Sequence, residues 1–173
     1  MQSSIDPRIL AIAAQLSEQD DAVPATRRVP FDLAQIATGL IALCSLAIGL
    51  FRIERLGTAN AYYAAAVRSM TESWHAFFFA AFDSEGFVTV DKPPMGLWIQ
   101  ALFAKALGFH GWSILLPQVL AATGSVLLIS HLVRKSFGPV AGLIAAASLA
   151  VTPITVAASR NNTSDTVLVF VLL

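Results

Sequence analysis

Long stretches without a charged residue constrain the fold of this chain more than any other feature. Three such stretches cover residues 33–51, 106–133 and 136–159, which are 19, 28 and 24 residues long. The hydrocarbon core of a bilayer is about 30 Å thick, and a helix rising about 1.5 Å per residue crosses it in about 20 residues. Each stretch is therefore long enough to span a membrane, and we exclude a soluble globular fold.

The composition agrees with a membrane protein. Apolar residues make up 56% of the chain and charged residues 13%, about half the usual charged fraction of about 25%. The net charge is zero and the basic residues form no stripe, so we expect no nucleic-acid partner. Cys44 is the single cysteine in the sequence, which excludes a disulfide within the chain.

We therefore predict an all-α, polytopic membrane helical bundle. The expected spans are about 33–51, 114–133 and 140–157, followed by a truncated apolar segment at 166–173. Because that last segment is too short to cross a bilayer, we interpret the sequence as the N-terminal part of a longer protein. Residues 1–32 are more polar and are predicted to form a cytoplasmic tail. The tail is compatible with either a short amphipathic helix or a disordered segment.

The distribution of basic residues predicts the orientation of the spans. Arg27 and Arg28 precede the first span, and Arg134 and Lys135 lie in the turn between the second and third spans. Such residues favour the cytoplasmic side, although arginines just after the first span weigh weakly against this orientation. The segment of about 52–112 then becomes a long external loop. Loops of that length in compact proteins are commonly functional.

Two helices are predicted to lie at the membrane interface within this loop. The first covers residues 59–74, with Asn60 as its cap and an Arg68–Glu72 pair on one face. Its other face presents an apolar stripe formed by Tyr63, Val67, Met70 and Trp74. The second covers residues 93–109 and has only 12 uncharged residues before Lys105, so we expect it to lie along the interface and not across the bilayer.

The sequence Asp91-Lys92-Pro93-Pro94 is the most informative local feature of the loop. The two prolines restrict the backbone after the charged pair, so the lysine can be held in a fixed direction. A fixed ammonium near a lipid surface suits a phosphate group, and a neighbouring carboxylate suits removal of a proton from a hydroxyl. The alternative is a surface ion pair worth less than about 1 kcal/mol.

A second polar cluster, Arg160-Asn161-Asn162-Thr163-Ser164-Asp165, follows the third span. Acidic residues beside membrane helices frequently mark a polar site, which favours a functional role for Asp165. The alternative is that Ser164 or Asp165 caps a helix beginning at Thr166. The three histidines of the chain have no ligand spacing, so a zinc site is not supported.

These motifs together resemble the N-terminal third of bacterial glycosyltransferase family 39. The resemblance covers about residues 33–173 and rests on five short sequences: Tyr62-Tyr63-Ala64, Asp91-Lys92-Pro93-Pro94-Met95-Gly96-Leu97-Trp98, Leu116-Pro117-Gln118, Arg134-Lys135-Ser136-Phe137-Gly138 with Ala141-Gly142-Leu143, and Arg160-x-Asn162-x-x-Asp165. The family includes protein O-mannosyltransferases and is similar to lipid A aminoarabinose transferases, which share the C-type glycosyltransferase fold.

The resemblance implies inverting transfer of a sugar from a polyprenyl-phosphate donor to a hydroxyl acceptor on a protein or glycolipid. By position, Lys92 would bind the donor phosphate, and Asp91 and Asp165 would be the catalytic acidic residues. We further predict substrate contacts from Arg160, Asn60 and Tyr63. The expected location is the inner or plasma membrane, with the active face extracytoplasmic.

One departure from the family concerns the catalytic base. The family usually has an Asp-Glu pair early in the first external loop, and Ala59 and Asn60 occupy those positions here. Three explanations stay open: Asp91 or Asp165 acts as the base, the protein uses a different acceptor from the rest of the family, or it has lost activity. We favour Asp91 as the base. No cofactor is implied with certainty, and a divalent metal stays open. We expect the fragment of residues 1–173 to be inactive by itself.

Two other functions stay open at this stage. Asp165 and Lys92 could line the translocation path of a multi-spanning transporter. The chain could also be a noncatalytic membrane subunit that binds lipid, which the missing Asp-Glu pair would explain.

Overall fold

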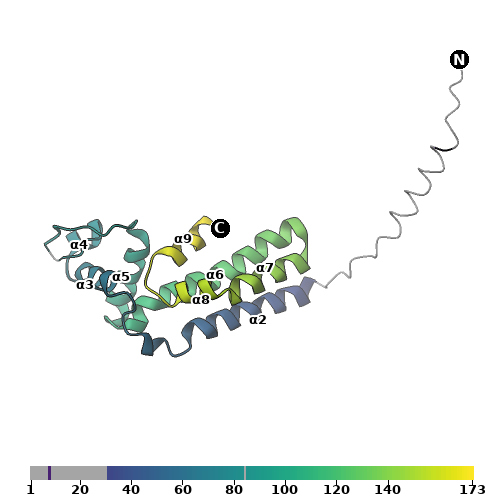
Figure 1. Ribbon diagram of the computed structural model, residues 1–173, viewed down its shortest axis with the longest axis horizontal. Helices are drawn as coiled ribbons and strands as arrows, with labels where there is room; N and C mark the ends of the chain where they lie inside the picture. The colour runs from purple at the N-terminus through teal and green to yellow at the C-terminus, as the bar shows by residue number, and fades with distance from the viewer. Residues whose placement is uncertain (1–7, 9–30, 84) are drawn as a thin grey trace, which may run out of the picture. The chain divides into compact units, whose positions relative to one another are not determined.

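The computed structural model describes Arg8 and residues 31–83 and 85–173 (Figure 1). The chain divides into two compact units, residues 1–30 and residues 31–173, and the second unit carries the fold. The tail predicted for residues 1–32 lies outside the described residues, apart from Arg8 and the first two residues of a helix.

The second unit is an all-α membrane bundle, as predicted. Its elements are α2 (Phe31–Leu50), the 3₁₀ helix η1 (Ile53–Leu56), α3 (Ala61–Glu72), α4 (Trp74–Phe79), α5 (Met95–Leu107), α6 (Gly111–Phe137), α7 (Pro139–Val151), α8 (Pro153–Ser159) and α9 (Asp165–Leu172). Within the described residues, α2 and α6 are long and apolar enough to cross a membrane, and α7 with α8 makes a third candidate when the bent pair counts as one span.

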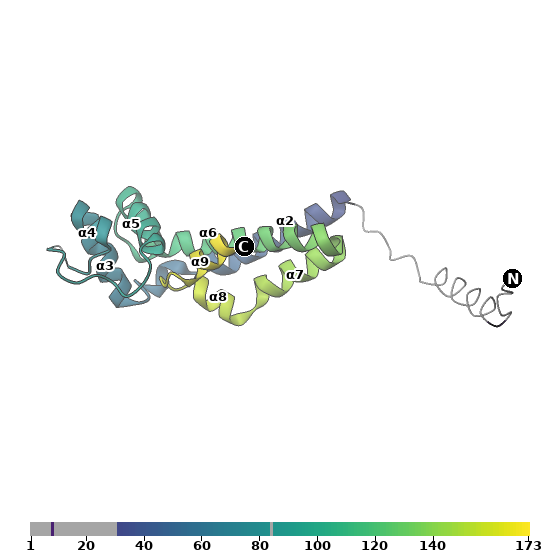
Figure 2. The same ribbon diagram turned by 90° about the horizontal axis from the view of Figure 1, so that it is seen from above.

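The third predicted span is not one continuous helix. The sequence predicts a helix over about 140–157, but α7 and α8 meet at a bend of 60°, which is visible in Figure 2. Pro153 starts α8, and Thr152 before it has extended backbone angles of φ −61° and ψ 121°. Proline supplies no N–H and disfavours the helical conformation in the preceding residue. The predicted span therefore corresponds to a bent pair of helices and not to one continuous helix.

Small residues and short polar contacts hold α2, α6 and α7 together. A tight turn at Gly138, whose φ is 89°, joins α6 to α7. A Cβ added at Gly142 would lie 2.8 Å from the carbonyl oxygen of Ser130, so only glycine allows this approach. The hydroxyls of Thr38 and Ser130 form a hydrogen bond of 3.1 Å between α2 and α6. Close approach of small residues and interhelical hydroxyl bonds are typical of packing in membranes.

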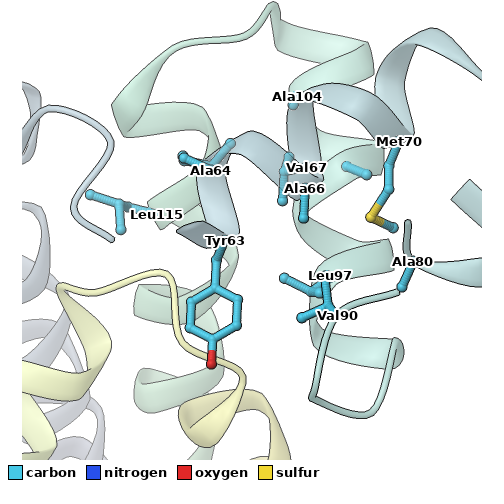
Figure 3. Packing of buried hydrophobic residues seen from close by; sticks show 12 residues of the cluster. Tyr63, Ala64, Ala66, Val67, Met70, Ala80, Val90, Leu97, Ala104 and Leu115 are labelled. Carbon is cyan, nitrogen blue, oxygen red and sulfur yellow. The ribbon is translucent and has the colours of Figure 1, made fainter. Parts of the chain in front are cut away.

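Helices α3, α4 and α5 gather at one end of α6, away from its turn with α7 (Figures 1 and 2). Their buried apolar side chains form one cluster with the first residues of α6 (Figure 3). The cluster includes Tyr63, Val67, Met70, Leu97, Ile114 and Leu115. The long segment between α2 and α6 is thus a packed part of the molecule that orients α3 and α5.

The predicted helix over 59–74 ends earlier than expected. The Arg68–Glu72 pair is present at 2.8 Å, which confirms that prediction. The helix stops at Ser73, because the Ser73 side chain accepts a hydrogen bond from the Ala76 N–H and caps α4 instead. Trp74 consequently leaves the buried stripe and is 73% exposed. Its ring lies 4.5 Å from the Lys105 ammonium, a distance at which a cation and an aromatic face attract each other.

Candidate functional site

The amino-terminal ends of α5 and α9 lie against each other. A Cβ added at Gly96, in the first turn of α5, would lie 2.9 Å from the Cβ of Ser164 and 3.1 Å from its Cα. The absence of a side chain at Gly96 therefore permits the approach. Because Lys92 comes just before α5 and Asp165 is the first residue of α9, the contact brings both predicted motifs to the same end of the bundle.

Tyr63 shows that the two motifs share one electrostatic environment. Burial raises the pKa of the Tyr63 hydroxyl above its usual value of 10.0, the Asp91 and Asp165 carboxylates raise that pKa further, and the Lys92 ammonium lowers it. In Figure 3 the Tyr63 ring points from α3 toward the segment that leads into α9. The hydroxyl is therefore a protonated hydrogen-bond donor that lies within electrostatic range of three predicted site residues.

The charged side chains of the site are accessible. Asp91, Lys92 and Asp165 are all exposed. Within the described residues, no salt bridge joins Asp91 to Lys92, so the surface ion pair considered above does not form. Both carboxylates and the ammonium are free to interact with a ligand.

The amino-terminal end of α9 keeps polar groups without protein partners. Neither Ser164 nor Asp165 supplies a side-chain cap to this helix, which contradicts the capping alternative. Ser164 follows the helical conformation with φ −75° and ψ −5°, whereas a capping residue normally has an extended backbone. The hydroxyls of Ser164 and Thr166 are buried and have no hydrogen-bond partner among the residues that the structure describes. First-turn N–H groups and hydroxyls of this kind favour anions.

Arg160 is used within the structure to fix the end of the first span. Its guanidinium donates hydrogen bonds to the carbonyl oxygens of Ile48 at 2.8 Å, Gly49 at 3.0 Å and Phe51 at 2.8 Å. These carbonyls lie at the carboxyl end of α2, where a cation is favoured. Arg160 thereby anchors the loop before α9 to the first span. Its predicted contact with substrate stays a prediction.

Asn60 caps α3, as predicted. Its side-chain oxygen accepts a hydrogen bond of 3.0 Å from the Tyr62 N–H. The Asn60 backbone is held in turn by the buried side chain of Asn162. Because the cap uses the Asn60 side chain, its predicted contact with substrate stays untested. In the part of the chain that the structure describes, no three His, Cys, Asp or Glu side chains gather as a metal site would require.

Comparisons with known proteins show which family the chain resembles. A Bacillus subtilis (strain 168) protein named "Putative mannosyltransferase YycA" is 52% identical over 143 residues, which are 83% of this chain and 20% of the relative. A second protein from the same strain, "Putative mannosyltransferase YkcB", is 50% identical over 134 residues, covering 78% of this chain and 19% of the relative. The family described as "Dolichyl-phosphate-mannose-protein mannosyltransferase" matches residues 91–173. The chain is thus similar in sequence to this mannosyltransferase family over residues 91–173, and to the two relatives over most of its length. No solved structure matches the chain significantly.

The mannosyltransferase-family segment begins at Asp91 and therefore contains both charged motifs. Tyr63 and Asn60 precede it. The chain spans about a fifth of the length of the two Bacillus relatives. At the position where the family resemblance leads one to expect an aspartate, Ala59 has a φ of 54°, a left-handed conformation that Asp and Asn tolerate better than Ala.

Two residues that contact each other at the site were not selected from the sequence. Asn162 is fully buried beside Asn60, and Gln100 on α5 donates a hydrogen bond to the Asn162 carbonyl oxygen. Asn162 belongs to the Arg160-x-Asn162-x-x-Asp165 pattern of the mannosyltransferase family, which was the available signal. No local pattern indicates Gln100, because its partner lies 62 residues away.

Proposed function

We propose that the full-length protein transfers a sugar, with inversion, from a polyprenyl-phosphate donor to a hydroxyl acceptor on the extracytoplasmic face of the cell membrane. The observation that carries this proposal is the close contact between Gly96 and Ser164, which brings the Lys92 and Asp165 motifs to one end of the bundle. The family match and the membrane bundle support it. One end of the bundle carries two carboxylates, one ammonium and a neutral phenol. These groups suit transfer from an anionic donor.

The proposed chemistry divides the charges by role. The acceptor oxygen attacks the anomeric carbon, and the bond between that carbon and the phosphate oxygen breaks with its electron pair leaving on the phosphate. Because the leaving group is already anionic, it needs a cation more than a general acid, and Lys92 supplies one. The proton of the acceptor hydroxyl goes to a carboxylate. We assign that role to Asp91, with Asp165 as the second acidic residue.

An apolar groove beside the site suits a lipid-linked donor. The groove lies between α5, α6 and α9 and encloses a cavity of about 330 Å³. Its lining residues include Ile99, Phe103, Pro117, Val167 and Phe170. Because α5 and α9 carry the charged motifs at their amino-terminal ends, a polyprenyl chain in the groove would leave its phosphate near Lys92.

The test is sugar transfer by the full-length protein in membranes. With radiolabelled polyprenyl-phosphate sugar, membranes that contain the wild type should transfer label to a hydroxyl acceptor, whereas Asp91→Asn should transfer about 10²-fold less. Repeating the assay with a chelator decides whether a divalent metal takes part. Equal transfer by the wild type, Asp91→Asn and Asp165→Asn would remove the proposed roles of both carboxylates.

Tyr63→Phe should raise the KM for the lipid-linked donor about tenfold. The substitution removes the hydroxyl that we propose donates to the donor phosphate, and hydrogen bonds to charged groups contribute about 1.5–3 kcal/mol. Since the Tyr63 pKa lies above 10.0, the hydroxyl stays protonated and the ratio of the two KM values should be constant from about pH 6 to about pH 9.

Tyr62→Phe is the matched control for this prediction. Tyr62 is 41% exposed, and its ring stacks on Phe82, so loss of its hydroxyl should leave the KM unchanged. Equal KM values for the wild type and Tyr63→Phe would show that the Tyr63 hydroxyl does not contact the donor.

A further inference from the structure

Asn162 makes three hydrogen bonds to two other segments of the chain. Its side-chain oxygen accepts from the Asn60 N–H at 2.8 Å, and its side-chain nitrogen donates to the Asn60 carbonyl oxygen at 3.0 Å. Its own carbonyl oxygen accepts from the Gln100 side-chain nitrogen at 3.0 Å. Asn162 and Gln100 are both fully buried. The side-chain amide of Asn162 is therefore paired with both backbone polar groups of Asn60.

The three joined segments are those that carry the site. Asn60 precedes Tyr63 by three residues, and Asn162 precedes Asp165 by three residues. Gln100 lies on α5, the helix that follows Lys92. Asn162 thus connects the start of α3, the middle of α5 and the loop before α9, although the first and last of these lie 102 residues apart in the sequence.

The geometry demands asparagine at this position. Aspartate would keep the acceptor for the Asn60 N–H but would lose the donor to the Asn60 carbonyl oxygen. A leucine would fill a similar volume but would leave the Asn60 N–H without a partner, and the Asn60 carbonyl oxygen would keep only its bond from the Ala64 N–H. Unpaired polar groups in a buried site cost more than the bond that held them.

We infer that Asn162 is a positioning residue for the transfer reaction, which holds Tyr63, Lys92 and Asp165 at one place through Asn60 and Gln100. The inference rests on the proposed function. Asn162 has no contact with substrate in this role, and it acts through the residues that it joins. Gln100 supports it from α5.

Two measurements on the full-length protein test the inference. Asn162→Leu should speed hydrogen exchange of the Asn60 amide about tenfold and raise the KM for the lipid-linked donor about tenfold. If the substitution only destabilised the fold, it would lower the amount of folded enzyme and the rate per unit of protein, but it would not alter the KM.

A second variant and a control complete the experiment. Gln100→Met removes the donor to the Asn162 carbonyl oxygen while keeping a similar shape, and it should raise the donor KM even where Asn162→Leu does not fold. Thr163→Val, in the same loop, should change neither quantity, because the Thr163 hydroxyl takes part in none of the hydrogen bonds of the described residues.

The outcomes separate this inference from the proposed function. Faster exchange at Asn60 with an unchanged donor KM, or unchanged exchange in Asn162→Leu, would overturn the positioning role while the wild type still transfers sugar. A wild type that transfers no sugar would overturn the proposed function and the inference with it.

Discussion

Lys92→Gln should lower sugar transfer by the full-length protein about 10²-fold or more. The substitution keeps much of the side-chain length and its polarity but removes the cation that faces the departing phosphate. Loss of one group that stabilises developing charge in a transition state typically costs about 10²–10³ in kcat. The measurement is the rate of label transfer from a polyprenyl-phosphate sugar in membranes, normalised to the amount of folded protein.

Lys105→Gln is the matched control for this prediction. Lys105 lies near the other end of α5, and its ammonium stands over the Trp74 ring. Its charge is remote from the Lys92 motif in the sequence, so its loss should change transfer less than about threefold. Lys92→Arg, which keeps the charge, should retain more activity than Lys92→Gln. Equal losses in Lys92→Gln and Lys105→Gln would show that the effect is general and not specific to the site.

Gly96→Val should separate the two motifs and abolish most transfer. Even the first side-chain carbon at this position would lie 3.1 Å from the backbone Cα of Ser164, which cannot move aside as a flexible side chain can. We expect a loss of about 1–3 kcal/mol of stability from overpacking. We also expect about a 10²-fold loss of transfer, because a displacement of about 1 Å at a catalytic site can cost that much.

Gly39→Val is its control. A Cβ at Gly39 meets no atom within 4 Å, so the same substitution in α2 should leave transfer unchanged. Thermal unfolding of both variants separates the stability effect from the effect on the site. Wild-type transfer by Gly96→Val would show that close contact between α5 and α9 is not needed.

The sequence was most informative about elements that depend on local composition. Uncharged stretches predicted the positions that α2 and α6 occupy, because the length of an apolar run is itself the physical requirement for crossing a membrane. The Asn60 cap and the Arg68–Glu72 pair were also predictable, since each joins residues two to four positions apart. The bend between α7 and α8 also had a signal in the sequence, because Pro153 lies inside the predicted span; the prediction did not use it.

Contacts between distant segments could not be predicted in the same way. Arg160 bonds to carbonyls more than 100 residues earlier in the chain, and carbonyl oxygens carry no sequence signal. The same holds for Asn162 and Asn60, because one partner contributes only its backbone. The charged residues of the candidate site were selected from their motifs, whereas the residues that join those motifs emerged only from the fold.

The central claim is that Lys92 and Asp165 lie on the same, extracytoplasmic side of the membrane. Single cysteines at positions 92 and 165, placed in a Cys44→Ser background of the full-length protein, can be labelled in intact cells with a membrane-impermeant maleimide. We expect both cysteines to react before the membrane is permeabilised. Reaction of one from outside and of the other only after permeabilisation would contradict it.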